Sequence, residues 1–159
     1  MTILLLGANL GDRVMTLRRA VDLIVEQVGL VRQQSHMYET APWGITDQPT
    51  YLNQVLAVET ELEPEAVLLK TQAIEQALGR VRLEKWGARL IDIDILYYDH
   101  RILHTDTLTV PHPYLHLRRF TLAPLAEISP EFTHPILEKT TLELLADCPD
   151  ESEVTIFNL

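Results

Sequence analysis

The chain has 159 residues, 47% of them hydrophobic and 23% charged, which is the length and balance of one ordinary globular domain. Its formal net charge of −10 argues against a general nucleic-acid binder, because such proteins need a basic surface to neutralise phosphates. Its single cysteine, Cys148, cannot form a disulfide within the chain and fits a reducing compartment. The apolar run at residues 3–6 is too short for a signal sequence or a membrane span, so we expect a cytoplasmic protein without membrane contact.

The first half of the chain alternates between strand-like and helix-like patterns. Apolar residues recur at helical spacing from Val14 to Val28, with Asp12 placed to cap this helix and Gly29 placed to end it. Pro64 lies in the first turn of a second helix, a position that suits proline. The expected elements are a strand at 2–6, a helix at 13–28, a strand at 30–40, a loop at 41–49, a strand at 51–60 and a helix at 64–78.

The second half begins with another strand and continues with shorter elements. The pattern predicts a strand at 90–96, a hairpin turn at 99–100, a loop at 111–113, helices at 121–127 and 137–146, and a strand at 154–157. Two successive strand-helix-strand units are typical of a split βαβ sandwich, so we predict an α+β fold of the order βαββαβ with extra C-terminal elements. Because no repeat, low-complexity run or linker interrupts the sequence, we expect one domain over residues 1–159.

Two aspartates, Asp92 and Asp94, lie in a strand that is otherwise aliphatic from Leu90 to Leu96. Alternate residues of a strand share a face, so these two side chains point the same way, with Cα atoms about 6.7 Å apart. Neighbouring carboxylates on an apolar strand repel each other and lose hydration, so they either keep a proton or recruit a cation. A hard divalent ion such as Mg²⁺, held by these carboxylates and by phosphate oxygens, would resolve the conflict.

A basic segment precedes this strand. Four of the thirteen basic residues of the chain lie within ten positions: Arg80, Arg82, Lys85 and Arg89. The planar guanidinium of arginine suits bidentate phosphate contacts, and with Trp86 and Gly87 the segment has the composition of a lid over a nucleotide. Two interpretations stay open here: a polyphosphate site, or a surface network in which the aspartates pair with Arg82 and Arg89 and Trp86 packs in the core.

A turn and a strand carry further candidates. Residues 7–11 lack the glycine spacing of a dinucleotide fold and the Gly-Lys-Ser/Thr ending of a P-loop, so we interpret them as a plain turn. Tyr51 and Asn53 are in phase on one strand, and an aromatic ring beside a buried amide would suit a flat, hydrogen-bonding heterocycle. Taken singly, Trp43, Tyr51 and Phe120 are scattered aromatic residues, which are usually core residues.

Two polar candidates near the C-terminal half have ordinary explanations as well. His112 lies between two prolines, a setting in which histidine is more often structural than catalytic. Arg118 and Arg119 either pair with Glu127 or bind phosphate.

The segment from Lys85 to Leu96 resembles the signature of the 6-hydroxymethyl-7,8-dihydropterin pyrophosphokinase family, and the resemblance extends over nearly the whole chain. It includes the blocks at 7–12, 38–44, 48–53, 79–82 and 111–113. The resemblance implies a ferredoxin-like α+β fold, which agrees with the βαββαβ order. It also implies transfer of the β,γ-diphosphate of ATP to the hydroxymethyl oxygen of the pterin, with release of AMP.

By this resemblance, Asp92 and Asp94 hold two Mg²⁺ ions that bridge the triphosphate, and the pterin ring stacks between Tyr51 and Phe120. The implied pterin-site residues are Thr40, Pro42, Trp43, Tyr51, Asn53 and Phe120. The implied nucleotide-site residues are Gln72, Glu75, Trp86, Arg89, His112 and Arg118. The implied catalytic arginines are Arg80, Arg82 and Arg89. The expected partners are the two small-molecule substrates alone, bound by a monomer without nucleic acid or membrane.

The chain departs from a familiar bacterial pattern at Ala8 and Pro113 and in the short segment between Arg82 and Trp86. These departures affect the expected adenine contacts and lid closure rather than the reaction. An Asp-x-Asp nucleotide-sugar transferase would explain the acids but not the Tyr-x-Asn strand or the glycine-punctuated N-terminal block. A ferredoxin-like ligand-sensing module would need neither the paired acids nor the arginine-rich segment.

Overall fold

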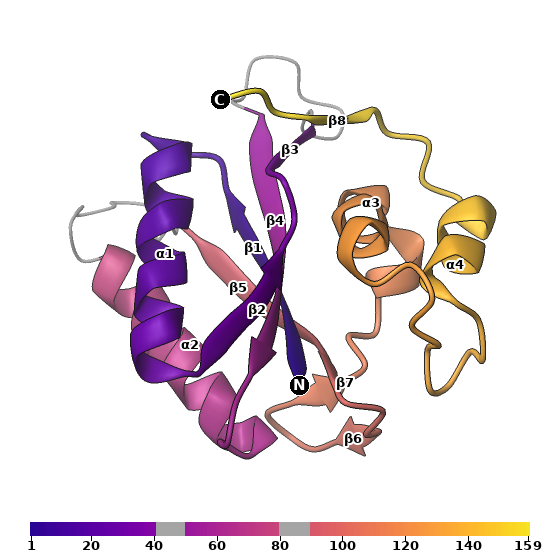
Figure 1. Ribbon diagram of the computed structural model, residues 1–159, viewed down its shortest axis with the longest axis horizontal. Helices are drawn as coiled ribbons and strands as arrows, with labels where there is room; N and C mark the ends of the chain where they lie inside the picture. The colour runs from indigo at the N-terminus through magenta and orange to yellow at the C-terminus, as the bar shows by residue number, and fades with distance from the viewer. Residues whose placement is uncertain (41–49, 80–89) are drawn as a thin grey trace.

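The structure is a computed structural model that describes residues 1–40, 50–79 and 90–159 (Figure 1). Six of the predicted site residues lie outside the described residues: Pro42, Trp43, Arg80, Arg82, Trp86 and Arg89. None of the helices in the described part of the chain is both long and apolar enough to cross a membrane.

The N-terminal part of the chain builds the central sheet and the two longest helices. These elements are β1 (Thr2–Ala8), α1 (Arg13–Gln27), β2 (Leu30–Gln34), β3 (Tyr38–Thr40), β4 (Tyr51–Glu59), α2 (Pro64–Gly79) and β5 (Asp92–Tyr98). The later elements are β6 (Leu103–His104), β7 (Thr109–Val110), a 3-10 turn η1 (Leu115–Leu117), α3 (Arg119–Ile128), α4 (Thr141–Asp147) and β8 (Val154–Ile156). The predicted α+β class is confirmed, with helices packed on an antiparallel sheet.

The sheet has the strand order β5-β1-β4-β3-β8, and β2 pairs with β4 beside β3. Every pairing in it is antiparallel. One strand was expected over residues 30–40, and the structure divides it into β2 and β3. The division occurs at Ser35, whose hydroxyl oxygen accepts the backbone N–H of Val55 at 3.0 Å in place of a ladder carbonyl.

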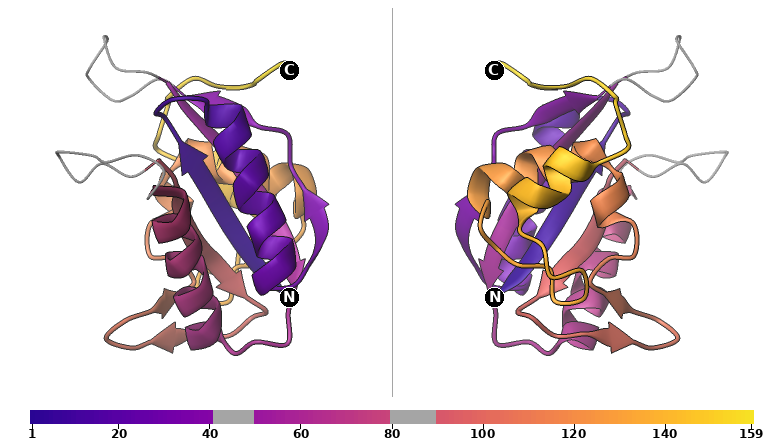
Figure 2. Two further views of the ribbon diagram at one scale, coloured as in Figure 1. Left: turned by 90° about the vertical axis from the view of Figure 1, so that its left-hand side faces the viewer. Right: turned by 90° about the vertical axis from the view of Figure 1, so that its right-hand side faces the viewer.

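Each face of the sheet is covered by its own pair of helices, as the two side views show (Figure 2). Leu4 and Leu6 of β1 belong to the core beneath α1 and α2, with Leu17, Ile24 and Ile74. Ile3 and Leu5, the alternate residues, belong to the core beneath α3 and α4. β1 is therefore buried on both faces, which explains why its sequence shows no polar alternation after Thr2.

Local signals define α1 as predicted. The Asp12 carboxylate accepts the N–H of Met15 at 3.1 Å and so caps the helix. After the helix, a Cβ on Gly29 would lie 2.1 Å from the carbonyl oxygen of Glu59, so no larger residue fits there. The turn expected at 99–100 is present, with the Arg101 N–H donating to the Tyr98 carbonyl at 3.0 Å, but it is not a hairpin turn, because β6 pairs with β7 and not with β5.

Candidate functional site

The two aspartates lie on β5, at one edge of the sheet, and face the side that carries α3. Ile91, Ile93 and Ile95 pack in the core beneath α1 and α2, so the predicted division of this strand into an acidic face and an aliphatic face is confirmed. Asp92 is exposed and Asp94 is half-buried. Asp94 lies opposite Leu5, which packs in the core beneath α3 and α4.

A single row of residues crosses three strands and joins the acids to the predicted pterin residues. Gly7 of β1 is directly opposite Asp92 on one side and directly opposite Asn53 of β4 on the other. Directly opposed residues of antiparallel strands project to the same face. Asp92 and Asn53 therefore share one face of the sheet, with only the hydrogen of Gly7 between them.

Gly7 leaves the space that Asn53 occupies. A Cβ at position 7 would lie 2.6 Å from Nδ2 of Asn53, closer than any ordinary contact. Asn53 is 4% exposed, and its Nδ2 donates to the carbonyl oxygen of Leu6 over a long 3.4 Å. Its Oδ1 is buried without a hydrogen-bond partner among the described residues. A buried amide oxygen of this kind is open to a donor from a ligand.

The next row of the same face adds two more predicted residues. Thr40 of β3 is directly opposite Tyr51 of β4. The Thr40 hydroxyl is also buried and, within the described ranges, has no partner, while Tyr51 is 37% exposed. Two unsatisfied polar atoms beside a partly exposed aromatic ring form a surface that suits a flat polar ligand.

His112 and Arg118 lie near the acids, on the segment that leads into α3. Burial lowers the pKa of His112, the carboxylate of Asp94 opposes this shift, and the charge of Arg118 adds to it. The imidazole is therefore neutral near pH 7. Its Nδ1 accepts the backbone N–H of Tyr114 at 3.2 Å, which leaves Nε2 as the nitrogen that carries the proton.

Arg118 connects this segment to Phe120. Its guanidinium carbon lies 5.3 Å from the ring centroid of Tyr114 and 5.7 Å from that of Phe120. Phe120 packs at the margin of the core beneath α3 and α4. The structure thus brings together four residues predicted from the sequence: Asp94, His112, Arg118 and Phe120.

Helix α2 reaches the site through Glu75. The Oε2 atom of Glu75 accepts the backbone N–H of Ile93 at 2.8 Å, between the two aspartates and on the side of β5 away from β1. Gln72 lies almost one turn earlier on α2 and is exposed. Glu75 is therefore placed beside the acids, whereas no described contact links Gln72 to them.

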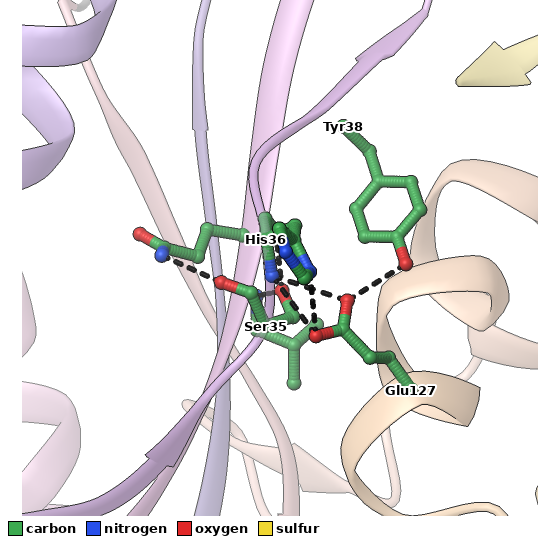
Figure 3. Close-up of polar contacts among 6 residues, drawn as sticks. Ser35, His36, Tyr38 and Glu127 are labelled. Atoms are coloured by element: carbon green, nitrogen blue, oxygen red, sulfur yellow. Dashed lines mark hydrogen bonds and ion pairs between the residues drawn. The ribbon is translucent and has the colours of Figure 1, made fainter. Parts of the chain in front are cut away.

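The sequence left open a pairing of Arg118 or Arg119 with Glu127, and this alternative is wrong. The backbone N–H and Nε of Arg119 donate to the side chain and carbonyl of Asp150, at 3.0 and 2.9 Å. Glu127 instead accepts hydrogen bonds from His36 and Tyr38 (Figure 3). Two contacts fix α3 to the rest of the chain: Arg119 with Asp150, and Glu127 with His36 and Tyr38. The sequence did not predict either contact, because the partners lie 31 and about 90 residues apart in the chain.

The chain is similar to known proteins in sequence. The sequence model of the family described as "7,8-dihydro-6-hydroxymethylpterin-pyrophosphokinase (HPPK)" matches residues 3–130. The chain is 41% identical over 138 residues to the 2-amino-4-hydroxy-6-hydroxymethyldihydropteridine pyrophosphokinase of Aquifex aeolicus, covering 87% of this chain and 86% of that protein. It is 45% identical over 124 residues to the Bacillus subtilis protein of the same name, covering 77% and 74%.

A likeness in three dimensions accompanies the likeness in sequence. The HPPK-DHPS of Plasmodium falciparum has a TM-score of 0.77 to this chain at 17% identity, covering 92% of this chain. This chain spans 42% of that longer protein, and the likeness establishes an HPPK-like fold.

Proposed function

The chain belongs to the 7,8-dihydro-6-hydroxymethylpterin-pyrophosphokinase family, and from this premise we propose how its residues carry out the reaction. The activity is transfer of the pyrophosphoryl group of ATP to the hydroxymethyl group of 6-hydroxymethyl-7,8-dihydropterin, a step of folate biosynthesis. The hydroxymethyl oxygen forms a bond to the β-phosphorus and loses its proton. The bond from the β-phosphorus to the oxygen shared with the α-phosphate breaks, and AMP leaves.

The pterin site is proposed on the face formed by Thr40, Tyr51 and Asn53, with Phe120 as the second aromatic wall. The support is a pair of buried polar atoms, Asn53 Oδ1 and Thr40 Oγ1, which lie in adjacent rows of one face and have no hydrogen-bond partner among the described residues. A ring that carries N–H donors would satisfy the Asn53 oxygen and stack on the phenol of Tyr51. Pro42 and Trp43 belong to the same proposal and lie outside the described residues.

Asp92 and Asp94 are proposed to hold two Mg²⁺ ions together with the phosphates of ATP. No cluster of three or more His, Cys, Asp or Glu side chains suited to a metal occurs in the described residues. Two carboxylates on one face fit Mg²⁺, which takes few protein ligands and completes its shell with water and phosphate oxygens. When bound, the ions would neutralise charge on the phosphates and align them for in-line attack.

The nucleotide is proposed to lie along β5, toward α2 and the segment that leads into α3. His112 is neutral and can donate from Nε2 to a phosphate oxygen, while Arg118 supplies a fixed positive charge. Gln72 and Glu75 on α2 form the opposite side. The arginines Arg80, Arg82 and Arg89 and the ring of Trp86 lie outside the described residues and stay predictions for this site.

The single observation that supports this assignment is the row Asp92–Gly7–Asn53, in which a residue proposed for the phosphate side and one proposed for the pterin side share a face. Positioning and electrostatics then supply most of the rate, because no side chain of the described face is placed as an obvious general base.

We also propose the ferredoxin-like class for the βαββαβ part, since β1 lies between β4 and β5 and each helix joins strands that are not neighbours. A single domain over residues 1–159 is supported by the one sheet that contains both β1 and β8. A monomer is proposed because one chain supplies all the described site residues, and a cytoplasmic location because its one cysteine, Cys148, is buried and unpaired.

The test is an incubation of the protein with ATP, Mg²⁺ and hydroxymethyldihydropterin, with nucleotides separated by chromatography. AMP and pterin diphosphate should form in equal amounts, and only when the pterin is present. Formation of ADP, or of AMP without dependence on the pterin, would contradict the assignment.

A further inference from the structure

Glu127, near the end of α3, makes four hydrogen-bond contacts with His36, between β2 and β3, and with Tyr38, the first residue of β3. Its Oε1 accepts from the Tyr38 hydroxyl at 2.8 Å and from the His36 backbone N–H at 3.1 Å. Its Oε2 accepts from the same N–H at 3.3 Å and contacts His36 Nδ1 at 2.9 Å (Figure 3). A carboxylate with this many donors holds its helix to the sheet at a defined position.

The residues that Glu127 holds are continuous with one wall of the proposed pterin site. Tyr38 is directly opposite Asn53, and β3 runs on from Tyr38 to Thr40. His36 lies at the break between β2 and β3, where the Ser35 hydroxyl interrupts the ladder. Pairing with β4 and β8 holds β3 in the sheet, and Glu127 ties its first residue, Tyr38, to α3.

The helix that carries Glu127 also carries the other wall of that site. Phe120 is seven residues earlier on α3, about two helical turns, so the two side chains lie on the same side of the helix. α3 packs directly against β3 and β4. Glu127 is therefore the polar link between the strand of Thr40 and the helix of Phe120.

Glu127 and Tyr38 keep the same charge over the ordinary pH range. Burial opposes ionisation of Glu127, but the hydrogen bonds from Tyr38 and His36 outweigh it and lower the pKa of this carboxyl. Burial, together with the bond to Glu127, raises the pKa of Tyr38 to about 12. Glu127 thus stays an acceptor and Tyr38 stays a donor.

We propose that Glu127 is a positioning residue for the pterin site, fixing the spacing between the two adjacent strands that carry Thr40 and Asn53 and the helix of Phe120. This inference rests on the proposed pterin site. It assigns Glu127 no contact with the substrate. Its loss widens the site and weakens pterin binding, while the acids and the nucleotide side keep their arrangement.

The experiment compares Glu127→Ala, Glu127→Gln and Tyr38→Phe with wild type, measuring KM for the pterin, KM for ATP and kcat by AMP formation. Glu127→Ala should raise the pterin KM about tenfold, because it removes charged hydrogen bonds, and should change the ATP KM less than about twofold. Glu127→Gln keeps one acceptor oxygen and should give an intermediate rise. Tyr38→Phe should give about a threefold rise, and adding it to Glu127→Ala should have no further effect.

The matched control is Glu143→Ala, which removes the bond from the Thr140 backbone N–H to the Glu143 carboxylate at the start of α4. It costs a hydrogen bond to a carboxylate on the same face of the sheet, and both KM values should stay at the wild-type level. If Glu127→Ala does not fold, Glu127→Gln and Tyr38→Phe carry the test, with folding checked by circular dichroism.

Unchanged pterin KM in folded variants, equal rises in both KM values, or the same rise in Glu143→Ala would overturn the positioning role. Asn53→Ala distinguishes this failure from failure of the premise, because it removes a proposed direct contact. An unchanged pterin KM in Asn53→Ala would contradict the pterin site itself and this inference with it.

Discussion

Gly7→Ala perturbs the row that joins the acids to the pterin side. The added methyl would lie 2.6 Å from Asn53 Nδ2, so the amide must move by roughly 0.5–1 Å to reach an ordinary contact. That movement breaks the long bond from Nδ2 to the Leu6 carbonyl and turns Oδ1 away from its present direction. Misplacement of a binding group by about 1 Å can cost on the order of 100-fold in rate.

The effect on stability should be much smaller than the effect on activity. Losing one weak hydrogen bond costs about 1 kcal/mol, and replacing glycine by alanine within a strand returns about 0.5–1 kcal/mol. We therefore expect kcat/KM for the pterin to fall by about 10- to 100-fold, with a change of less than about 1 kcal/mol in the free energy of unfolding. The assays are pterin-dependent AMP formation and urea unfolding followed by circular dichroism.

Gly29→Ala provides the control, because its methyl would meet the backbone carbonyl oxygen of Glu59 at 2.1 Å, in the turn after α1. This variant should lose stability by more than Gly7→Ala does, without a selective rise in the pterin KM. A Gly7→Ala protein with wild-type kcat/KM for the pterin would refute the argument that this glycine makes room for Asn53.

Three further predictions concern stability and the two substrates. Asp150→Asn should lower the free energy of unfolding at pH 7 by about 1–2 kcal/mol, because a carboxylate that accepts from Arg119 and Ser152 becomes a neutral amide. These bonds outweigh burial and lower the pKa of Asp150, so the wild type should lose this stabilisation as pH falls below about 4. In urea titrations, the free energy of unfolding of Asp150→Asn should therefore depend less on pH in this range. Thr140→Ala should lower the free energy of unfolding by about 1 kcal/mol, because it removes the cap of α4, and should leave the KM values for pterin and ATP unchanged. A selective change in either KM would contradict the separation of α4 from the site. His112→Phe should raise the ATP KM more than the pterin KM, because it removes the Nε2 donor beside Asp94; a selective pterin effect would reverse that placement.

The parts of the fold that follow local rules were predictable from the sequence. Asp12 and the apolar spacing after it define α1 to within one residue, because caps and helical periodicity act over a few positions. The shared face of Asp92 and Asp94 follows from strand alternation in the same way. The division of residues 30–40 into β2 and β3 was not predictable. It depends on the Ser35 hydroxyl, which accepts the backbone N–H of Val55, twenty residues later in the chain.

The site was predictable in its residue types but not in its supports. Asn53 and Tyr51 are marked by their phase on one strand, whereas the open space at Gly7 appears only when three strands are aligned. Glu127 and Asp150 carry no sequence signal, because each acts on a partner that the folded chain brings near. Side-chain pairs of this kind depend on the packing of α3 against the sheet.

The most direct test of the central claim, that one face holds both the phosphates and the pterin, is turnover and pterin binding in Asp94→Ala. The folded variant should bind pterin with nearly the wild-type Kd by calorimetry and form no measurable AMP, whereas Asp106→Ala, a change at an exposed turn, should keep full turnover. AMP formation by Asp94→Ala at the wild-type rate would contradict the claim.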